Sequence, residues 1–159
     1  MSPEAELDVE ALVQVLRERG ATVATAESLT GGLVASTLVS VSGVSDTFRG
    51  GVVAYAVDVK TSLLDVDAAL LARTGAVAEP VARAMAESVR QRLGATFGLA
   101  TTGVAGPEPS GGQPAGTTHV AVAGPEGVAH RELRLGGDRQ AVREACVRAV
   151  LRLLGEQLR

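Results

Sequence analysis

The sequence has no tryptophan, two phenylalanines and one tyrosine, so aromatic residues make up only 2% of its 159 residues. Proteins that bind single-stranded nucleic acid stack the bases on rows of aromatic side chains, and this chain has no such row. Its formal net charge is −3, and no basic tail supplies the clustered cations that a phosphate backbone requires. The composition therefore argues against nucleic acid as a partner.

Cysteine and long apolar runs are equally scarce. Cys146 is the only cysteine, which excludes an internal disulfide and favours a reducing compartment. No apolar run approaches the ~20 residues of a membrane span, and residues 1–8 lack the basic start and apolar stretch of a signal peptide. We therefore expect a cytoplasmic protein with no membrane partner.

The residues that are present suit a folded domain. Hydrophobic residues make up 46% of the chain and the mean hydropathy is +0.23, well above the values of disordered chains. A chain of this length fits one domain and buries most of the surface that its unfolded form exposes. We expect a single domain over residues 1–159, with a core built from valine, leucine and alanine.

Apolar periodicity and turn residues predict the secondary structure. A first helix is expected to open at Ser2 and Pro3 and to close at Gly20, and further helices are expected near residues 33–40, 67–73, 79–93 and 138–157. Strands are expected at residues 22–26, 51–55 and 96–101, followed by a hairpin of residues 117–123 and 128–135. This order predicts a three-layer α/β/α domain with a mixed, mostly parallel sheet and an antiparallel hairpin. Cys146 falls on the apolar face of the last helix, so we expect it in the core.

The first candidate site follows the first predicted strand, where Ser28 begins a turn that contains Gly31 and Gly32. A serine before a helix is usually an N-cap that only stabilises the helix. In the functional alternative, the Ser28 hydroxyl is a nucleophile and neighbouring backbone N–H groups stabilise an oxyanion. The two glycines favour the second interpretation modestly, because they allow close approach to the backbone.

The second candidate is Lys60, the only lysine among fifteen basic residues, five positions after the only tyrosine, Tyr55. Arginine stays protonated above pH ~12, whereas burial can lower the pKa of a lysine from ~10.4 to ~7 or 8 and make it a base. A surface lysine that survives by chance is the alternative. The functional interpretation pairs Lys60 with a serine nucleophile, because no histidine stands near either segment.

The third candidate is the glycine-rich loop of residues 103–116, which follows Thr102 at the end of a predicted strand. Such a loop is often only a set of turns, and its alternative role is an anion-binding nest of backbone N–H groups. His119 and His130 fall one on each strand of the hairpin, without a carboxylate or cysteine cluster at ligand spacing. We interpret both histidines as structural and expect neither a metal nor a cofactor.

With these residues identified, the chain resembles the nicotinamide-nucleotide amidase family, also known as the CinA C-terminal domain family. The resemblance covers nearly the whole chain and rests on five ordered motifs, which are residues 26–32, residues 51–55 with Lys60, residues 75–78, residues 102–107, and residues 137–139 with Arg143. It implies an amidohydrolase that converts nicotinamide mononucleotide to nicotinate mononucleotide and ammonia, in pyridine-nucleotide salvage.

The resemblance also assigns roles that agree with the interpretation from the residues. Ser28 is the nucleophile and Lys60 the base, while Tyr55 and Thr102 assist in the proton and hydrogen-bond network. The substrate is expected to contact three groups of residues. Thr30, Gly31 and Gly32 supply N–H groups for the oxyanion. The N–H groups of the loop and one cation bind the phosphate, namely Gly103, Ala105, Gly106, Gly111, Gly112 and Arg143.

Two positions depart from the family pattern, because Gln113 stands where lysine is usual and Val57 where asparagine is common. A substrate contact is therefore in doubt at each position. Two other functions stay open from the sequence: a non-catalytic nucleotide-binding module linked to competence or DNA damage, and a Ser-Lys amidase for another small amide. A homodimer is the oligomer that base rates favour.

Overall fold

The computed structural model describes residues 6–159, in which five strands form one mixed sheet of order β2-β1-β3-β4-β5. Strand β1 (Val23–Glu27) lies between β2 (Phe48–Val53) and β3 (Phe97–Gly103) and is parallel to both. Strands β4 (Thr117–Gly124) and β5 (Gly127–Arg134) continue the sheet from β3 in antiparallel fashion. The predicted mixed sheet with an antiparallel hairpin is confirmed.

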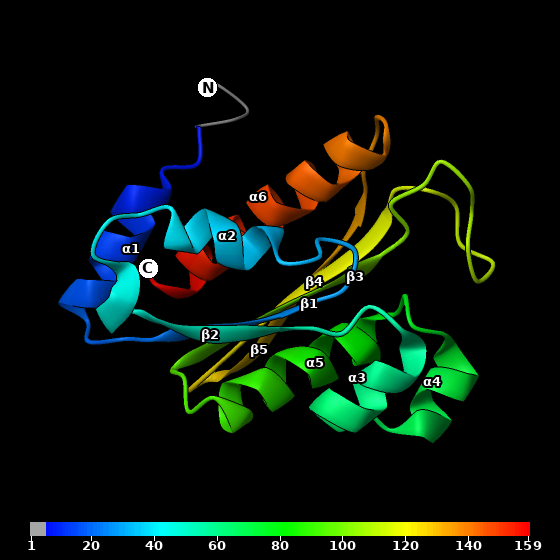
Figure 1. Cartoon of the computed structure of the whole chain (residues 1–159), viewed down its shortest axis with the longest axis horizontal. Coiled ribbons are helices and arrows are strands. Elements are labelled where there is room, and N and C mark those ends of the chain that lie inside the picture. Colours follow the sequence, from blue (N-terminus) through cyan, green and yellow to red (C-terminus); the bar gives the residue numbers. More distant parts are fainter. Residues whose placement is uncertain (1–5) are drawn as a thin grey trace.

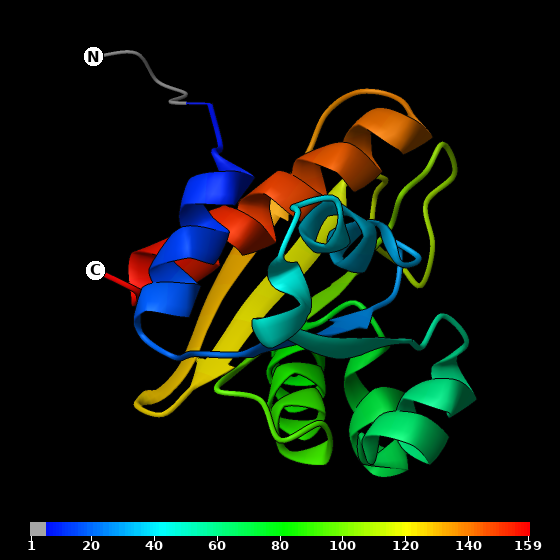
Figure 2. The same ribbon diagram turned by 60° about the vertical axis from the view of Figure 1, so that its left-hand side comes forward.

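Helices cover both faces of this sheet. Helices α1 (Val9–Glu18), α2 (Leu33–Val39) and α6 (Arg139–Gln157) lie on one face, and α3 (Val57–Leu64), α4 (Ala68–Thr74) and α5 (Glu79–Arg92) lie on the other (Figure 1). The turned view shows α6 running across the first face beside α1 and α2, with α5 on the opposite side (Figure 2). A short 3-10 helix, η1 (Val44–Asp46), precedes β2. The three predicted layers are therefore present.

Side-chain alternation along the strands divides the buried residues into two cores. On β1, Val23 packs with the valine- and leucine-rich cluster under α1, α2 and α6, whereas Ala24 and Ala26 pack with the cluster under α5. Period-2 alternation places successive residues of a strand on opposite faces of the sheet, so each strand contributes to both clusters. Cys146 of α6 is completely buried in the first cluster, as predicted, and burial raises the pKa of its thiol to about 12.

Several predicted boundaries need correction. Helix α1 begins at Val9 with Asp8 as its N-cap, while the predicted capping residues Ser2 and Pro3 lie outside the described residues. Strand β2 begins at Phe48 and ends at Val53, so Tyr55 lies beyond it. The stretch around Lys60, for which the sequence pattern predicted no regular element, is helix α3. None of the helices in the described part of the chain combines the length and the hydrophobicity that a membrane span requires.

Candidate active site

The candidate site lies at the carboxyl ends of the parallel strands, where sites of such sheets usually form. Ser28 directly follows β1, and its N–H donates to the carbonyl oxygen of Thr101 near the end of β3, at 3.1 Å. Helix α3 approaches this edge from the other face and contributes Lys60. Three segments distant in the sequence therefore meet at one point of the sheet.

Lys60 and Ser28 form a buried hydrogen-bonded pair. The Lys60 Nζ lies 3.0 Å from the Ser28 Oγ, 2.8 Å from the carbonyl oxygen of Ala54 and 3.1 Å from that of Tyr55. Only 1% of Lys60 and 7% of Ser28 is exposed. The interpretation of Lys60 as a surviving surface lysine is therefore excluded.

Burial also lowers the pKa of Lys60 from 10.5 to about 8, because the charged ammonium loses its hydration. Among residues 6–159 no acidic side chain forms an ion pair with Lys60, so no opposite charge counters this effect. Near neutral pH an appreciable fraction of the side chain is the neutral amine that a base requires.

The three acceptors around Nζ suit both protonation states of Lys60. An ammonium donates to all three oxygens. A neutral amine keeps two N–H bonds for the Ala54 and Tyr55 carbonyl oxygens and directs its lone pair toward the Ser28 hydroxyl, which then becomes the donor. A proton can therefore pass from Oγ to Nζ without movement of the heavy atoms.

The turn after Ser28 is built from left-handed glycines. Gly31 and Gly32 have φ angles of 57° and 102°, which strain any residue with a Cβ. Gly32, not Ser28, is the N-cap of α2, so the N-cap interpretation of Ser28 is wrong. The Gly31 N–H donates to the Ser28 carbonyl oxygen, whereas the N–H groups of Leu29, Thr30 and Gly32 donate to no acceptor within residues 6–159. Three backbone donors of this turn thus remain, and those of Thr30 and Gly32 are the predicted oxyanion donors.

Thr102 and Tyr55 lie near the pair, but their side chains bond elsewhere. The Thr102 hydroxyl donates to the carbonyl oxygen of Ala76 at 2.8 Å, and the hydroxyl next to the Ser28 N–H is that of Thr101. Tyr55 is 63% exposed, and its hydroxyl accepts a 3.4 Å hydrogen bond from Arg139. The direct contribution of Tyr55 to the pair is therefore its carbonyl oxygen.

Two arginines of α6 hold the loops of this edge. Arg143 donates to the carbonyl oxygens of Leu29, at 2.9 Å, and Thr30, at 3.3 Å, so its side chain fastens the turn after Ser28. Arg139 donates to the carbonyl oxygen of Gly106 at 2.7 Å and thereby ties the glycine-rich loop to Tyr55. The side chain of Arg143, the predicted phosphate-binding arginine, is therefore engaged by the carbonyl oxygens of Leu29 and Thr30.

The glycine-rich loop of residues 103–116 has a buried base and an exposed tip. Ala105 and Gly106 are buried, while Gly111 and Gly112 are exposed. A Cβ on Gly103 would lie 2.8 Å from the carbonyl oxygen of Thr117, so this glycine is required by the close pairing of β3 with β4. The predicted substrate-binding residues of the loop thus divide into a structural base and an accessible tip.

Three residues with prominent roles at this edge were not predicted, namely Glu27, Thr101 and Arg139. Glu27 is 1% exposed and accepts hydrogen bonds from three groups of the turn and of α2. Glu27 and Arg139 were recognised only as parts of motifs, without a role. A buried acid directly before a nucleophile has no sequence motif of its own. The local sequence does not show which polar side chains are buried by segments that are distant along the chain.

The two histidines, one on β4 and one on β5, contact each other. The His119 Nδ1 lies 2.9 Å from the His130 Nε2, with the rings stacked at 5.2 Å, and Glu79 lies 3.5 Å from the His130 Nδ1. Within residues 6–159 no group of three or more histidine, cysteine, aspartate or glutamate side chains could hold a metal ion.

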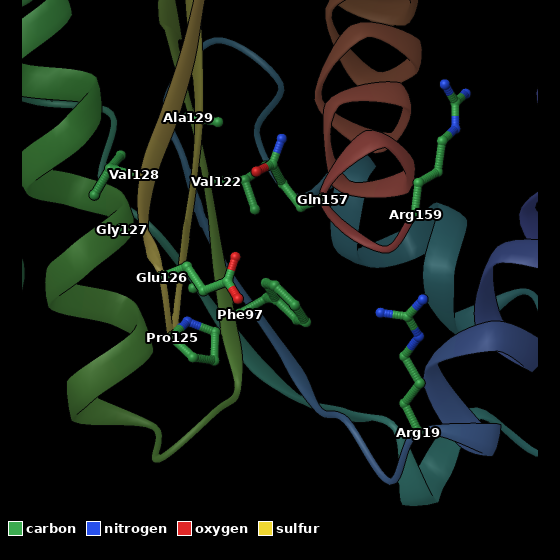
Figure 3. Close-up of a pocket in the computed structure, with 11 residues that line it drawn as sticks. Arg19, Phe97, Val122, Pro125, Glu126, Gly127, Val128, Ala129, Gln157 and Arg159 are labelled. Atoms are coloured by element: carbon green, nitrogen blue, oxygen red, sulfur yellow. The ribbon is translucent and has the colours of Figure 1, made fainter.

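A pocket of about 420 Å³ lies at the other end of the sheet, around the β4–β5 turn and the end of α6 (Figure 3). It is lined by Arg19, Phe97, Val122, Pro125, Glu126, Gln157 and Arg159 among others. None of the predicted site residues belongs to it.

The family model of the CinA C-terminal domain matches residues 6–158. A CinA-like protein of Frankia casuarinae is 54% identical over 144 residues, which cover 91% of this chain and 33% of that protein. A putative competence-damage inducible protein of Desulforamulus reducens is 48% identical over 88% of this chain and 34% of its own length. The chain thus spans about a third of these curated relatives.

Solved structures match along their whole length. A competence/damage inducible protein from Agrobacterium tumefaciens superposes with a TM-score of 0.89 at 36% identity, covering 100% of both chains. A competence or damage-inducible protein from Enterobacter asburiae gives a TM-score of 0.91 at 30% identity over 97% of this chain and 100% of that one.

Proposed function

The chain belongs to the CinA C-terminal domain family, and on that premise we propose that it is an amidohydrolase that deamidates nicotinamide mononucleotide. The products are nicotinate mononucleotide and ammonia, in the salvage of pyridine nucleotides. The observation that carries the proposal is the buried contact of 3.0 Å between the Lys60 Nζ and the Ser28 Oγ. A lysine whose pKa is lowered to about 8 is matched to a serine that needs a base near neutral pH.

The reaction begins with proton transfer from the Ser28 hydroxyl to the neutral amine of Lys60. The Ser28 Oγ attacks the carboxamide carbon of the substrate, and a C–O bond forms as the carbonyl oxygen becomes an oxyanion. The free N–H groups of Thr30 and Gly32 are suited to stabilise this oxyanion, because they are fixed beside the nucleophile before the reaction starts.

Lys60 then returns its proton to the amide nitrogen, the C–N bond breaks and ammonia leaves. An ester remains between Ser28 and the nicotinate group. Water attacks this ester while Lys60 accepts the water proton, and the proton passes to the Ser28 Oγ as the acid is released. In both half-reactions the carbonyl oxygens of Ala54 and Tyr55 are suited to hold the Lys60 Nζ in place.

The nucleotide part of the substrate lies toward the glycine-rich loop in this proposal. Backbone N–H groups of the exposed tip at Gly111 and Gly112 are suited to bind the phosphate. The exposed ring of Tyr55 is suited to stack on the pyridinium ring, which carries a positive charge. Arg143 contributes by holding the turn after Ser28, and Thr102 by holding the segment of Ala76.

An assay of ammonia release across nicotinamide, its riboside, its mononucleotide and glutamine tests the proposal. We expect the mononucleotide to give the highest kcat/KM. Release from glutamine or another amide alone would assign the Ser-Lys chemistry to a different substrate. Absence of release from every amide, with tight binding of the mononucleotide, would support a non-catalytic nucleotide-binding module instead.

A further inference from the structure

Glu27 is a buried acid that the proposed chemistry does not use. It is the last residue of β1, stands directly before Ser28 and is 1% exposed. Within residues 6–159 it forms no ion pair. Burial raises the pKa of the Cys146 thiol in the first core, and the nearby Glu27 carboxylate adds to this effect. A buried charge without a cation requires a compensating set of hydrogen bonds.

Helix α2 and the turn before it supply that set. One Glu27 carboxylate oxygen, Oε1, accepts from the Val34 N–H at 2.8 Å and from the Thr30 hydroxyl at 2.6 Å, and Oε2 accepts from the Ala35 N–H at 3.1 Å. The first N–H groups of a helix lack intrahelical partners, and the N-cap of α2 is Gly32, which has no side chain to cap them. Glu27 therefore caps α2 from five residues before the N-cap and ties the helix to the end of β1.

The same carboxylate sets the direction of a chain of hydroxyl groups. A carboxylate only accepts, so the Thr30 hydroxyl gives its single proton to Glu27. In the 2.8 Å contact between the Thr30 and Thr101 hydroxyl oxygens, Thr101 must then be the donor. The lone pairs of the Thr101 Oγ1 are left for the Ser28 N–H, at 3.3 Å, which this hydroxyl shares with the carbonyl oxygen of Thr101, at 3.1 Å.

We infer that Glu27 is a positioning residue, whose carboxylate acts through Thr30 and Thr101 to hold Ser28 with its hydroxyl facing Lys60. The inference rests on the proposed function of Ser28 as nucleophile. Glutamine has nearly the same shape but only one acceptor oxygen, so Glu27→Gln leaves the Ala35 N–H facing an amide NH₂. Thr30→Val leaves both backbone contacts of Glu27 in place and removes the hydroxyl that donates to Glu27 and accepts from Thr101.

Thr25 provides a matched control on the same strand. It is also completely buried, and its hydroxyl is a buried polar group without a partner among the described residues. Thr25→Val therefore removes the same chemical group as Thr30→Val, from the same region of the protein, without touching the chain that leads to Ser28.

The test measures ammonia release and the covalent labelling of Ser28 by a fluorophosphonate, in which the Oγ–P bond forms, fluoride leaves and the proton passes to Lys60. With rates corrected for the folded fraction, we expect Glu27→Gln to lower kcat and the labelling rate ~10-fold or more, because small displacements of a nucleophile have large effects. KM should change less than about twofold, since Glu27 lies behind the turn. Thr30→Val should show part of the same loss, and Thr25→Val none.

The outcomes separate the inference from the proposed function. A wild-type protein that is neither labelled at Ser28 nor active on the amides contradicts the proposed nucleophile, and the inference fails with it. A wild-type protein that is labelled at Ser28, together with Glu27→Gln and Thr30→Val variants that react within twofold of it, overturns the inference alone. An equal loss in Thr25→Val also overturns it, because the effect would then be a general consequence of altering β1.

Discussion

Replacement of Lys60 by arginine separates a base from a mere positive charge. Arginine preserves the charge and the approximate length of the side chain, so an electrostatic role would survive the change. Lys60 has a pKa of about 8, so about half of it is neutral at pH 8, whereas an arginine stays protonated at this pH. We therefore expect Lys60→Arg to lower kcat on the order of 10³-fold or more.

A second variant, Lys60→Met, is needed because Lys60→Arg can destabilise the fold. Lys60 is among the largest fully buried side chains, and the bulkier arginine costs about 1–3 kcal/mol by overpacking. Lys60→Met keeps the linear shape without charge. This change removes the cost of burying the ammonium, which the shift of the pKa from 10.5 to about 8 places at roughly 3 kcal/mol. It also removes the hydrogen bonds of Nζ to Ala54 and Tyr55, at about 1 kcal/mol each. Lys60→Met should therefore be as stable as the wild type and equally inactive.

The assay is ammonia release from nicotinamide mononucleotide at pH 8, with circular dichroism and thermal unfolding as checks on the fold. Ser28→Ala and the double variant Ser28→Ala/Lys60→Arg should lose about as much as Lys60→Arg alone, because the two residues act as a unit. A folded Lys60→Arg protein that retains more than about a tenth of the wild-type kcat would refute the base role, since a general base usually contributes 10²-fold or more.

Three further results are expected. The kcat/KM of the wild type should rise with pH, reach about half of its maximum near pH 8 and level off above that pH, as the neutral form of Lys60 becomes dominant, and a flat profile between pH 6 and 9 would contradict this. The riboside should have a far lower kcat/KM than the mononucleotide, because it lacks the phosphate that loop N–H groups bind, and equal values would remove that assignment. The pKa values of His119 and His130 are lowered, mainly by burial. The charged residues that face the two rings are Glu79, Arg83, Glu132 and Arg134. The folded state thus disfavours their protonation, so stability should be full above pH 6.5 and should fall as the pH drops below it. Urea unfolding at pH 7.5 and 5.5 should show a smaller decrease for a His119→Gln/His130→Gln variant, and an unchanged decrease would exclude the pair as its cause.

The layers of the fold were predictable because they follow from local periodicity. The α5 and α6 helices bury many apolar residues, α5 has a proline in its first turn and α6 has Asp138 as its N-cap, and the hairpin has glycine at its turn, so their positions were close to the predicted ones. Helix α3 was missed because it is short and weakly amphipathic, and it is held in place by contacts that form only after folding, above all those of Lys60.

Part of the site was predictable for a chemical reason. Ser28 and Lys60 stood out because a strand-end serine with glycines and a solitary lysine are unusual in this composition, and the structure brings them together. The network of Glu27 and Thr101 could not be predicted, because it depends on the register of β1 against β3 and on the position of α2. Neither is recorded in the local sequence.

The central claim is that Ser28 and Lys60 together hydrolyse the amide of nicotinamide mononucleotide. Ammonia and nicotinate mononucleotide measured together, for the wild type and for Ser28→Ala at equal folded fraction, test it most directly. We predict that the wild type releases the two products in equal amounts and that Ser28→Ala is slower on the order of 10³-fold or more. A wild-type protein that releases neither product, or a Ser28→Ala variant that retains more than about a tenth of the wild-type rate, would contradict the claim.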